Sequence, residues 1–206
     1  MALLAANILF GANFSLYVSL TQHGVSFQQL FILQLTVATF IFAPFVLLSK
    51  RSYHIALEDF GLIFIVSIIV VYGWMYMLLW GATETSPIDA SMIATLGPVV
   101  TLFISHIAHP QPISWIKVLG ALIAIAGTLA LMTNKNYHPL GTTNEAFGNA
   151  LVLFAVIAIA INTVLINKQL RIYGVLTIVG WYYIIGLIMA APFFYKDFLD
   201  IFSLSV

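Results

Sequence analysis

The chain has 206 residues, of which 62% are hydrophobic and only 7% are charged, and its formal net charge is zero. A soluble domain carries roughly 25% charged residues, so this chain lacks the polar side chains that a water-facing surface needs. Zero net charge gives no basic patch for nucleic acid, and the absence of cysteine excludes disulfides and thiol catalysis. The composition therefore predicts a protein whose main solvent is lipid.

Long apolar runs divide the chain into about seven transmembrane spans. A helix needs about 20 apolar residues to cross the hydrocarbon core. Runs of this kind occupy residues 1–20, 25–49, 61–80, 88–107, 113–132, 148–166 and 175–194. Backbone groups in lipid must be satisfied internally, so only helices or a closed barrel span a membrane, and uninterrupted apolar runs exclude a barrel. We therefore predict an all-α, multi-pass protein of the cell (inner) membrane.

The positions of Lys and Arg predict how the spans are oriented. With a cytoplasmic N-terminus, the inner connections hold five of the seven basic residues. The inner residues are Lys50, Arg51, Lys117, Lys168 and Arg171, and the outer ones are Lys135 and Lys196. Because short cytoplasmic loops carry an excess of Lys and Arg, this orientation is the expected one.

A weak internal repeat relates the last two spans to the first two. The repeated positions are Asn13, Gly24 and Pro44 in the first copy and Asn162, Gly174 and Pro192 in the second. Both copies end in Ala-Pro-Phe. Five spans separate the starts of the copies, and because five is odd, the second copy is inverted in the membrane. Inverted repeats are typical of transporters, although chance similarity among apolar helices is the alternative.

Three stretches of the sequence resemble a known family. They are ANILFGANFSLYVSL, GATETSPIDASMIATLGPVVTLFISH and ISWIKVLGALIAIAGTLAL. In this order they are similar to the first, fourth and fifth helices of the EamA-like family of the drug/metabolite transporter superfamily. The resemblance implies an inverted-repeat transporter fold, which in this family has ten helices in two five-helix repeats.

The seven predicted spans cover only part of the family's pattern. Residues 1–132 correspond to a first five-helix repeat, residues 133–147 to a polar loop, and residues 148–206 to the first two helices of a second, incomplete repeat. Family members often carry an Arg in the second helix and a Glu before the fifth, where this chain has Gln34 and Gln111. Without these two charges, the resemblance gives no indication of a charged substrate or of proton coupling.

Polar and helix-breaking residues inside the spans are candidates for substrate binding, because polar groups are costly in lipid. Asn13 and Asn162 occupy equivalent places in the two copies, and they either line a cavity or bond neighbouring helices together. Gln34 lies deep in the second span, at the family's Arg position. Gly97 and Pro98 interrupt the fourth span, which gives either a hinge with a carbonyl free for substrate or a tolerated kink.

An aromatic stripe in the third span is a further candidate for substrate binding. Tyr72, Tyr76 and Trp80 are spaced four residues apart and therefore share one helix face. Such a stripe either lines a path for amphipathic or cationic solutes through cation–π contacts, or packs against lipid and neighbouring helices.

No catalytic constellation accompanies these features. His106 and His109 are three residues apart but lack a third ligand for a metal, and no His-Glu-x-x-His motif is present. We therefore expect no enzymatic activity, no cofactor and no bound metal. The expected function is export or exchange of small metabolites or drugs by alternating access, and the alternative is a non-transporting truncated or accessory membrane protein. The expected partners are a small-molecule substrate and the lipid bilayer, with a homo-oligomer left open and no nucleic acid.

Overall fold

The structure is a computed structural model that describes residues 16–17, 19–21, 23–49, 55–108, 114–132 and 144–203. In this part of the chain every regular element is a helix, and five spans are long and apolar enough to cross a membrane. The five are Phe27–Leu48, Leu57–Glu84, Asp89–Ala108, Glu145–Leu165 and Val175–Asp197. The predicted all-α membrane fold is confirmed. Most of the first predicted span, residues 1–20, lies outside the described residues, and the fifth is a shorter apolar helix, α7.

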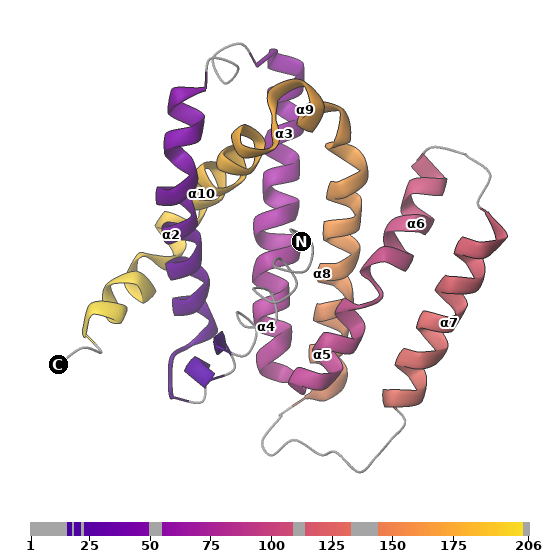
Figure 1. Cartoon of the computed structure of the whole chain (residues 1–206). Coiled ribbons are helices and arrows are strands. Elements are labelled where there is room, and N and C mark those ends of the chain that lie inside the picture. The colour runs from indigo at the N-terminus through magenta and orange to yellow at the C-terminus, as the bar shows by residue number, and fades with distance from the viewer. Residues whose placement is uncertain are drawn as a thin grey trace.

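Figure 1 shows the helices in their order along the chain. They are α2 (Phe27–Leu48), α3 (Leu57–Ile68), η2 (Ile69–Tyr76), α4 (Met77–Glu84), α5 (Pro87–Ala94), α6 (Gly97–Ala108), α7 (Trp115–Met132), α8 (Glu145–Leu165), α9 (Asn167–Tyr173) and α10 (Val175–Ser203). The start of α2 is fixed by a capping box. The Ser26 hydroxyl accepts from the Gln29 N–H (3.2 Å), and the Gln29 side chain accepts from the Ser26 N–H (2.9 Å).

The third span is a continuous rod whose middle part is a π-helix. α3 passes directly into η2, eight residues long, and then into α4. π-Helices are rare, usually last a single turn and are frequent at functional sites. Neighbouring helices approach this segment closely through small residues, because Gly186 of α10 faces Val71 and Gly73 faces Ala158 of α8.

The fourth span is broken where the Gly-Pro pair predicted an interruption. α5 ends at Ala94, Thr95 and Leu96 form a turn, and α6 begins at Gly97. Pro98 is the second residue of α6, where its missing N–H costs little because the first N–H groups of a helix have no partner within the helix. The break therefore divides the span into two short helices.

α2 and α10 pack against each other and run in opposite directions (Figure 1). The Thr177 hydroxyl, near the start of α10, donates to the Ser49 hydroxyl just after α2 (3.2 Å). Phe31, near the start of α2, instead meets the ring of Phe194 towards the other end of α10. An inverted repeat requires its second and seventh spans to run in opposite directions, so this pairing agrees with the predicted inverted-repeat fold.

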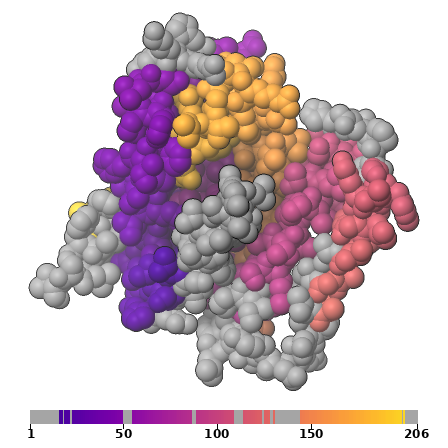
Figure 2. Space-filling model, viewed as in Figure 1, coloured from indigo at the N-terminus to yellow at the C-terminus, as the bar shows by residue number. Residues whose placement is uncertain are grey.

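α8 lies between the third span and α5–α6, whereas α7 lies at the edge of the molecule (Figures 1 and 2). The α7 side chains of Ile116, Leu122 and Ile123 are exposed. A Cβ atom added at Gly120 or Gly127 would meet no atom within 4 Å. Although small residues are typical of close helix packing, these two glycines are not used for packing within the described part of the chain.

The described basic residues are distributed between the two ends of the spans as the orientation requires. The start of α7, which carries Lys117, and α9, which carries Lys168 and Arg171, lie at the end of the molecule where α2 finishes (Figure 1). The last part of α10, which carries Lys196, lies towards the opposite end. This distribution agrees with a cytoplasmic location of the first group. We call the end with α9 the inner end, and the end where α4 meets α5 the outer end.

Candidate functional site

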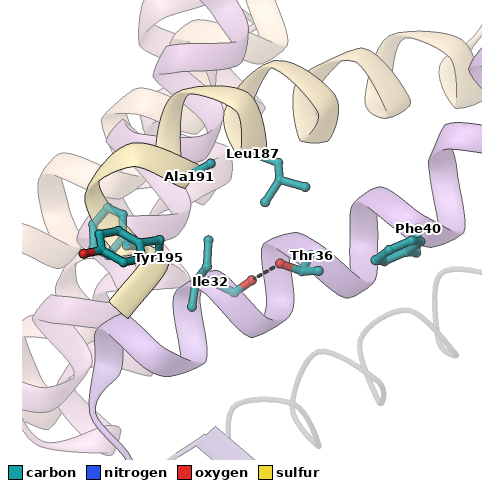
Figure 3. A pocket seen from close by; sticks show the side chains of 7 residues that line it. Ile32, Thr36, Phe40, Leu187, Ala191 and Tyr195 are labelled. Carbon is teal, nitrogen blue, oxygen red and sulfur yellow. Dashed lines mark hydrogen bonds between the residues drawn. The ribbon is translucent and has the colours of Figure 1, made fainter. Parts of the chain in front are cut away.

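A groove between α2 and α10 is the candidate functional site (Figure 3). Its volume is about 350 Å³, within the range of about 300–1,000 Å³ that ligand pockets occupy. The lining residues are Ile32, Thr36 and Phe40 from α2 and Leu187, Ala191, Phe194 and Tyr195 from α10. All seven belong to the two predicted spans or follow them directly, so a molecule in this groove would lie within the membrane.

The groove offers little polarity to a ligand. The Thr36 hydroxyl donates to the carbonyl of Ile32 (2.7 Å), a bond within the same helix that Figure 3 shows. None of the seven lining side chains carries a formal charge. Because an unpaired charge is costly at membrane depth, the groove favours an apolar or aromatic group over an ion.

An aromatic cluster adjoins the groove through Phe194, which belongs to both. Tyr76 lies in this cluster, and four other rings surround it at distances typical of tilted and edge-to-face aromatic pairs. Their centroids lie at the following distances from that of Tyr76: Phe31 at 5.1 Å, Phe27 at 5.6 Å, Phe194 at 5.8 Å and Trp80 at 6.3 Å. The rings come from α2, the third span and α10, so the cluster holds these three together.

The other two members of the predicted stripe also make contacts between helices. The Tyr72 hydroxyl donates to the carbonyl of Gly186 in α10 (3.1 Å). Trp80 stacks on Phe27 with a centroid distance of 5.9 Å and meets Phe147 of α8 edge-on at 5.3 Å. Of the two interpretations that the sequence left open, these contacts favour packing between helices. The phenylalanines that complete the cluster were missed, although Phe27 and Phe31 show the same four-residue spacing.

Of the predicted amide residues, Asn162 and Gln34 do not line the groove. Asn162 is buried, and its Oδ1 accepts a hydrogen bond from the Tyr182 hydroxyl (2.9 Å). This bond joins α8 to α10, which is the role in helix association that the sequence left open for Asn162. Gln34 lies on the exposed side of α2, and Asn13 lies outside the described residues.

The predicted hinge is separated from the groove by α8. α6 packs against α8, whereas the groove lies between α2 and α10 (Figure 1). Pro98 is exposed, and a Cβ atom at Gly97 would meet nothing within 4 Å. The structure therefore brings the three aromatic candidates together beside the groove and places the hinge, Gln34 and Asn162 elsewhere.

A polar cluster at the inner end has no counterpart among the sequence predictions. Asp59, in the first turn of α3, accepts from Nε2 of Gln169 through Oδ1 (3.0 Å) and from the hydroxyl of Tyr173 through Oδ2 (2.7 Å). The Tyr173 oxygen accepts in turn from the Ala56 N–H (3.3 Å). The bond that Tyr173 donates to the Asp59 carboxylate raises the pKa of this phenol above its ordinary value. The cluster fastens α9 to the start of α3.

The outer end is closed by a contact between backbones. Gly148, at the start of α8, lies so close to the corner between α4 and α5 that an added Cβ would come within 2.7 Å of the backbone nitrogen of Thr85. A Cβ at Gly81 would likewise lie 2.9 Å from the carbonyl oxygen of Gly148. The Thr85 hydroxyl donates to Oδ1 of Asn149 (2.6 Å) across the same junction. Glycine is therefore required at this junction for α4 and α8 to approach each other.

Apolar spans and an antiparallel helix pair with a groove between its two members define an all-α integral membrane protein. The profile of the EamA-like transporter family matches residues 1–133. The chain belongs to this family, and the resemblance seen in the sequence is confirmed. The family points to a transporter rather than an enzyme.

Curated relatives support the same assignment. The chain is 28% identical over 161 residues to an uncharacterized transporter of Archaeoglobus fulgidus, covering 78% of this chain and 55% of the relative. It is 28% identical over 120 residues to a WAT1-related protein of Arabidopsis thaliana, covering 53% and 32%, and 23% identical over 147 residues to the uncharacterized transporter YetK of Bacillus subtilis, covering 71% and 42%. The chain thus spans about half the length, or less, of these relatives. No solved structure matches it.

Proposed function

We propose that this chain takes part in the export or exchange of small metabolites or drugs by alternating access. The observation that carries the proposal is the groove between α2 and α10, two antiparallel helices from the two proposed repeats. In transporters built from inverted repeats, substrate sites lie near the bilayer midplane at the interface of the repeats. Residues 1–132 would supply the first repeat, and residues 148–206 would supply two helices of the second, after the loop at 133–147.

The chemistry of the groove supports an uncharged or aromatic moiety as the part of the substrate that it holds. Its walls are apolar, and its threonine hydroxyl is already bonded to the backbone. The ring of Tyr76 contacts Phe194, which lines the groove, and the ring of Trp80 contacts Tyr76 in turn. A rearrangement of these rings would expose aromatic faces to a substrate, as the predicted stripe requires.

Two irregular segments give the spans places at which to bend during transport. The break before Gly97 separates α5 from α6, and η2 interrupts the α-helical hydrogen bonding of the third span. Interrupted helices mark transporter sites, and π segments recur where function needs an altered helix. We assign the hinge role to Gly97 and Pro98, whereas Asn162 would bond the moving helices together.

The test is substrate-dependent flux in vesicles that contain the full chain, measured across a broad metabolite panel. Filling the groove with Ala191→Phe should reduce flux strongly, because Ala191 lines it. Ile188→Phe is the matched control, since Ile188 is an exposed residue of the same helix that does not line the groove. Equal flux in the two variants would exclude the groove as the site. No flux across the whole panel would favour the alternative, a non-transporting accessory or truncated membrane protein.

A further inference from the structure

We propose that the corner between α8 and α9 binds the headgroup of an anionic phospholipid. A notch with a volume of about 470 Å³ lies at this corner. It is lined by Val164, Leu165, Asn167, Lys168, Gln169 and Arg171. None of these residues lines the groove between α2 and α10, so the notch is a second, separate site.

The lining of the notch changes from apolar to cationic over a few residues. Val164 and Leu165 belong to the last turn of α8, which is a membrane span, and the Leu165 side chain is 43% exposed. Lys168 and Arg171 belong to α9, outside the spans, and both are exposed. A phospholipid presents the same order of chemistry at the edge of the hydrocarbon core, with acyl chains followed by phosphate. The notch therefore matches a lipid at the depth where lipid headgroups lie.

The charge of the notch selects an anionic lipid. No carboxylate is among the six lining residues. Asp59 is outside the lining and attracts Lys168, but its single negative charge leaves the two cations of the lining in excess. An Arg guanidinium pairs with phosphate through two parallel hydrogen bonds, and Lys adds a compact charge beside it. A headgroup with net negative charge gains from both, whereas the ammonium of a zwitterionic headgroup would be repelled.

The polar cluster at the inner end holds the notch in shape. Gln169 and Tyr173 are 5% and 7% exposed, and both are bonded to Asp59. Because α9 is fixed, binding of a headgroup by Lys168 and Arg171 does not also have to order the backbone that carries them, which favours binding. The buried Oε1 of Gln169 has no hydrogen-bond partner among the described residues. Phosphatidylglycerol, an anionic lipid whose headgroup also carries hydroxyl groups, is the probe for this site.

The experiment is a lipid titration of the purified full chain in detergent, read by native mass spectrometry. We expect saturable binding of phosphatidylglycerol and at least tenfold weaker binding of phosphatidylcholine. The variant Lys168→Gln/Arg171→Gln should bind phosphatidylglycerol about thirtyfold more weakly, given the contribution of each basic side chain near an anionic surface. Lys117→Gln is the matched control, because Lys117 is an exposed basic residue at the same end that does not line the notch. Its affinity should change less than about twofold, since it makes no contact with the bound headgroup.

Three results would overturn the proposal. Equal binding of the two lipids would remove the selectivity for negative charge. If Lys117→Gln lost as much affinity for phosphatidylglycerol as the double variant, the lipid would be held by a general attraction to the basic end of the protein and not by the notch. Displacement of the bound lipid by an equal concentration of soluble glycerol phosphate would assign the notch to a free anion. Because the readout is binding, none of these results bears on whether the chain transports a solute.

Discussion

At the inner end of the molecule, Asp59 of α3 holds Gln169 and Tyr173 of α9 through side-chain hydrogen bonds. At the outer end, Gly148 of α8 packs against the backbone at Thr85. Both contacts join the proposed first repeat to the second. The two contacts differ in what happens when the partners separate. The polar side chains at the inner end can exchange their hydrogen bonds for bonds to water. The close packing of two backbones at the outer end is not replaced by any hydrogen bond to water.

This difference indicates which end is able to open. A hydrogen bond that is exchanged for bonds to water changes the free energy by only about 1 kcal/mol, and by somewhat more where a carboxylate takes part. Separating packed backbones gives up close dispersion contacts, and no hydrogen bond to water takes their place. Under the alternating-access proposal, the inner end is therefore the releasable junction, and the outer end is the more rigid one in this conformation.

The largest effect is expected from cross-linking the inner end and the outer end in separate variants, which tests the comparison between them directly. The chain has no cysteine, so introduced pairs react alone. Asp59→Cys/Gln169→Cys joined by a short bifunctional thiol reagent should abolish flux, because α9 can no longer leave α3. Thr85→Cys/Asn149→Cys joined in the same way should also block flux, because alternating access requires each end to open in turn, but this pair should link in higher yield, since the outer end is the more rigid one. Each pair without reagent is its own control, and a higher yield of the inner link than of the outer link would reverse the assignment of the releasable end.

Gly148→Ala tests the steric contact at the outer end. The new Cβ would lie within 2.7 Å of the Thr85 nitrogen, and because backbone cannot yield cheaply, the variant should lose about 3 kcal/mol of unfolding free energy. Gly61→Ala is the matched control, since a Cβ there meets nothing within 4 Å. Because alanine is a better helix former than glycine, the unfolding free energy of the control should rise by up to about 1 kcal/mol. Denaturant unfolding in detergent measures both, and equal effects would contradict steric closure.

The sequence predicted the spans because lipid leaves few choices. The run at 25–49 became α2, Phe27–Leu48, and the Gly97-Pro98 pair marked the break in the fourth span. Apolar length and the need to satisfy every backbone group determine such features locally. The π-helix in the third span has no comparable signal, since small residues of α8 and α10 pack against it only after the chain has folded.

The two ends were missed for a related reason. Asp59 and Gln169 are 110 residues apart, and an Asp in the first turn of a helix is expected there in any case, because it favours the positive end of the helix dipole. Gly81 and Gly148 are visible as small residues, but their pairing depends on how α4 and α8 meet. The aromatic stripe was recognised from its spacing, whereas its partners on α2 and α10 come from distant parts of the chain.

Tyr173→Phe tests the polar contact at the inner end. It removes the hydroxyl that donates to Asp59 at 2.7 Å, and a hydrogen bond to a charged group contributes about 2 kcal/mol. Asp59→Asn should also destabilise the fold, and the double variant should cost less than the sum of the two single variants, since the two residues share one bond. Denaturant unfolding supplies the values. Full additivity would show that the two side chains do not interact, and the inner cluster would then lose its role.

The smallest expected effect is a dependence on alkaline pH that belongs to the inner end alone. The Tyr173 hydroxyl donates to the Asp59 carboxylate, and this bond raises the pKa of the phenol in the folded state. Its contribution to stability is therefore complete below the ordinary tyrosine pKa of about 10, and it is lost as the pH rises through the raised value.

The measurement compares unfolding free energies of the native chain and Tyr173→Phe from neutral to alkaline pH. The difference between them should be constant up to a pH of about 10 and should shrink above it, because the variant lacks the phenol that titrates. Gly148→Ala should differ from the native chain by a constant amount throughout, since its contact involves no proton. A shrinking difference for Gly148→Ala as well would mean that alkaline pH loosens the whole molecule, and the distinction between a polar inner end and a steric outer end would fail.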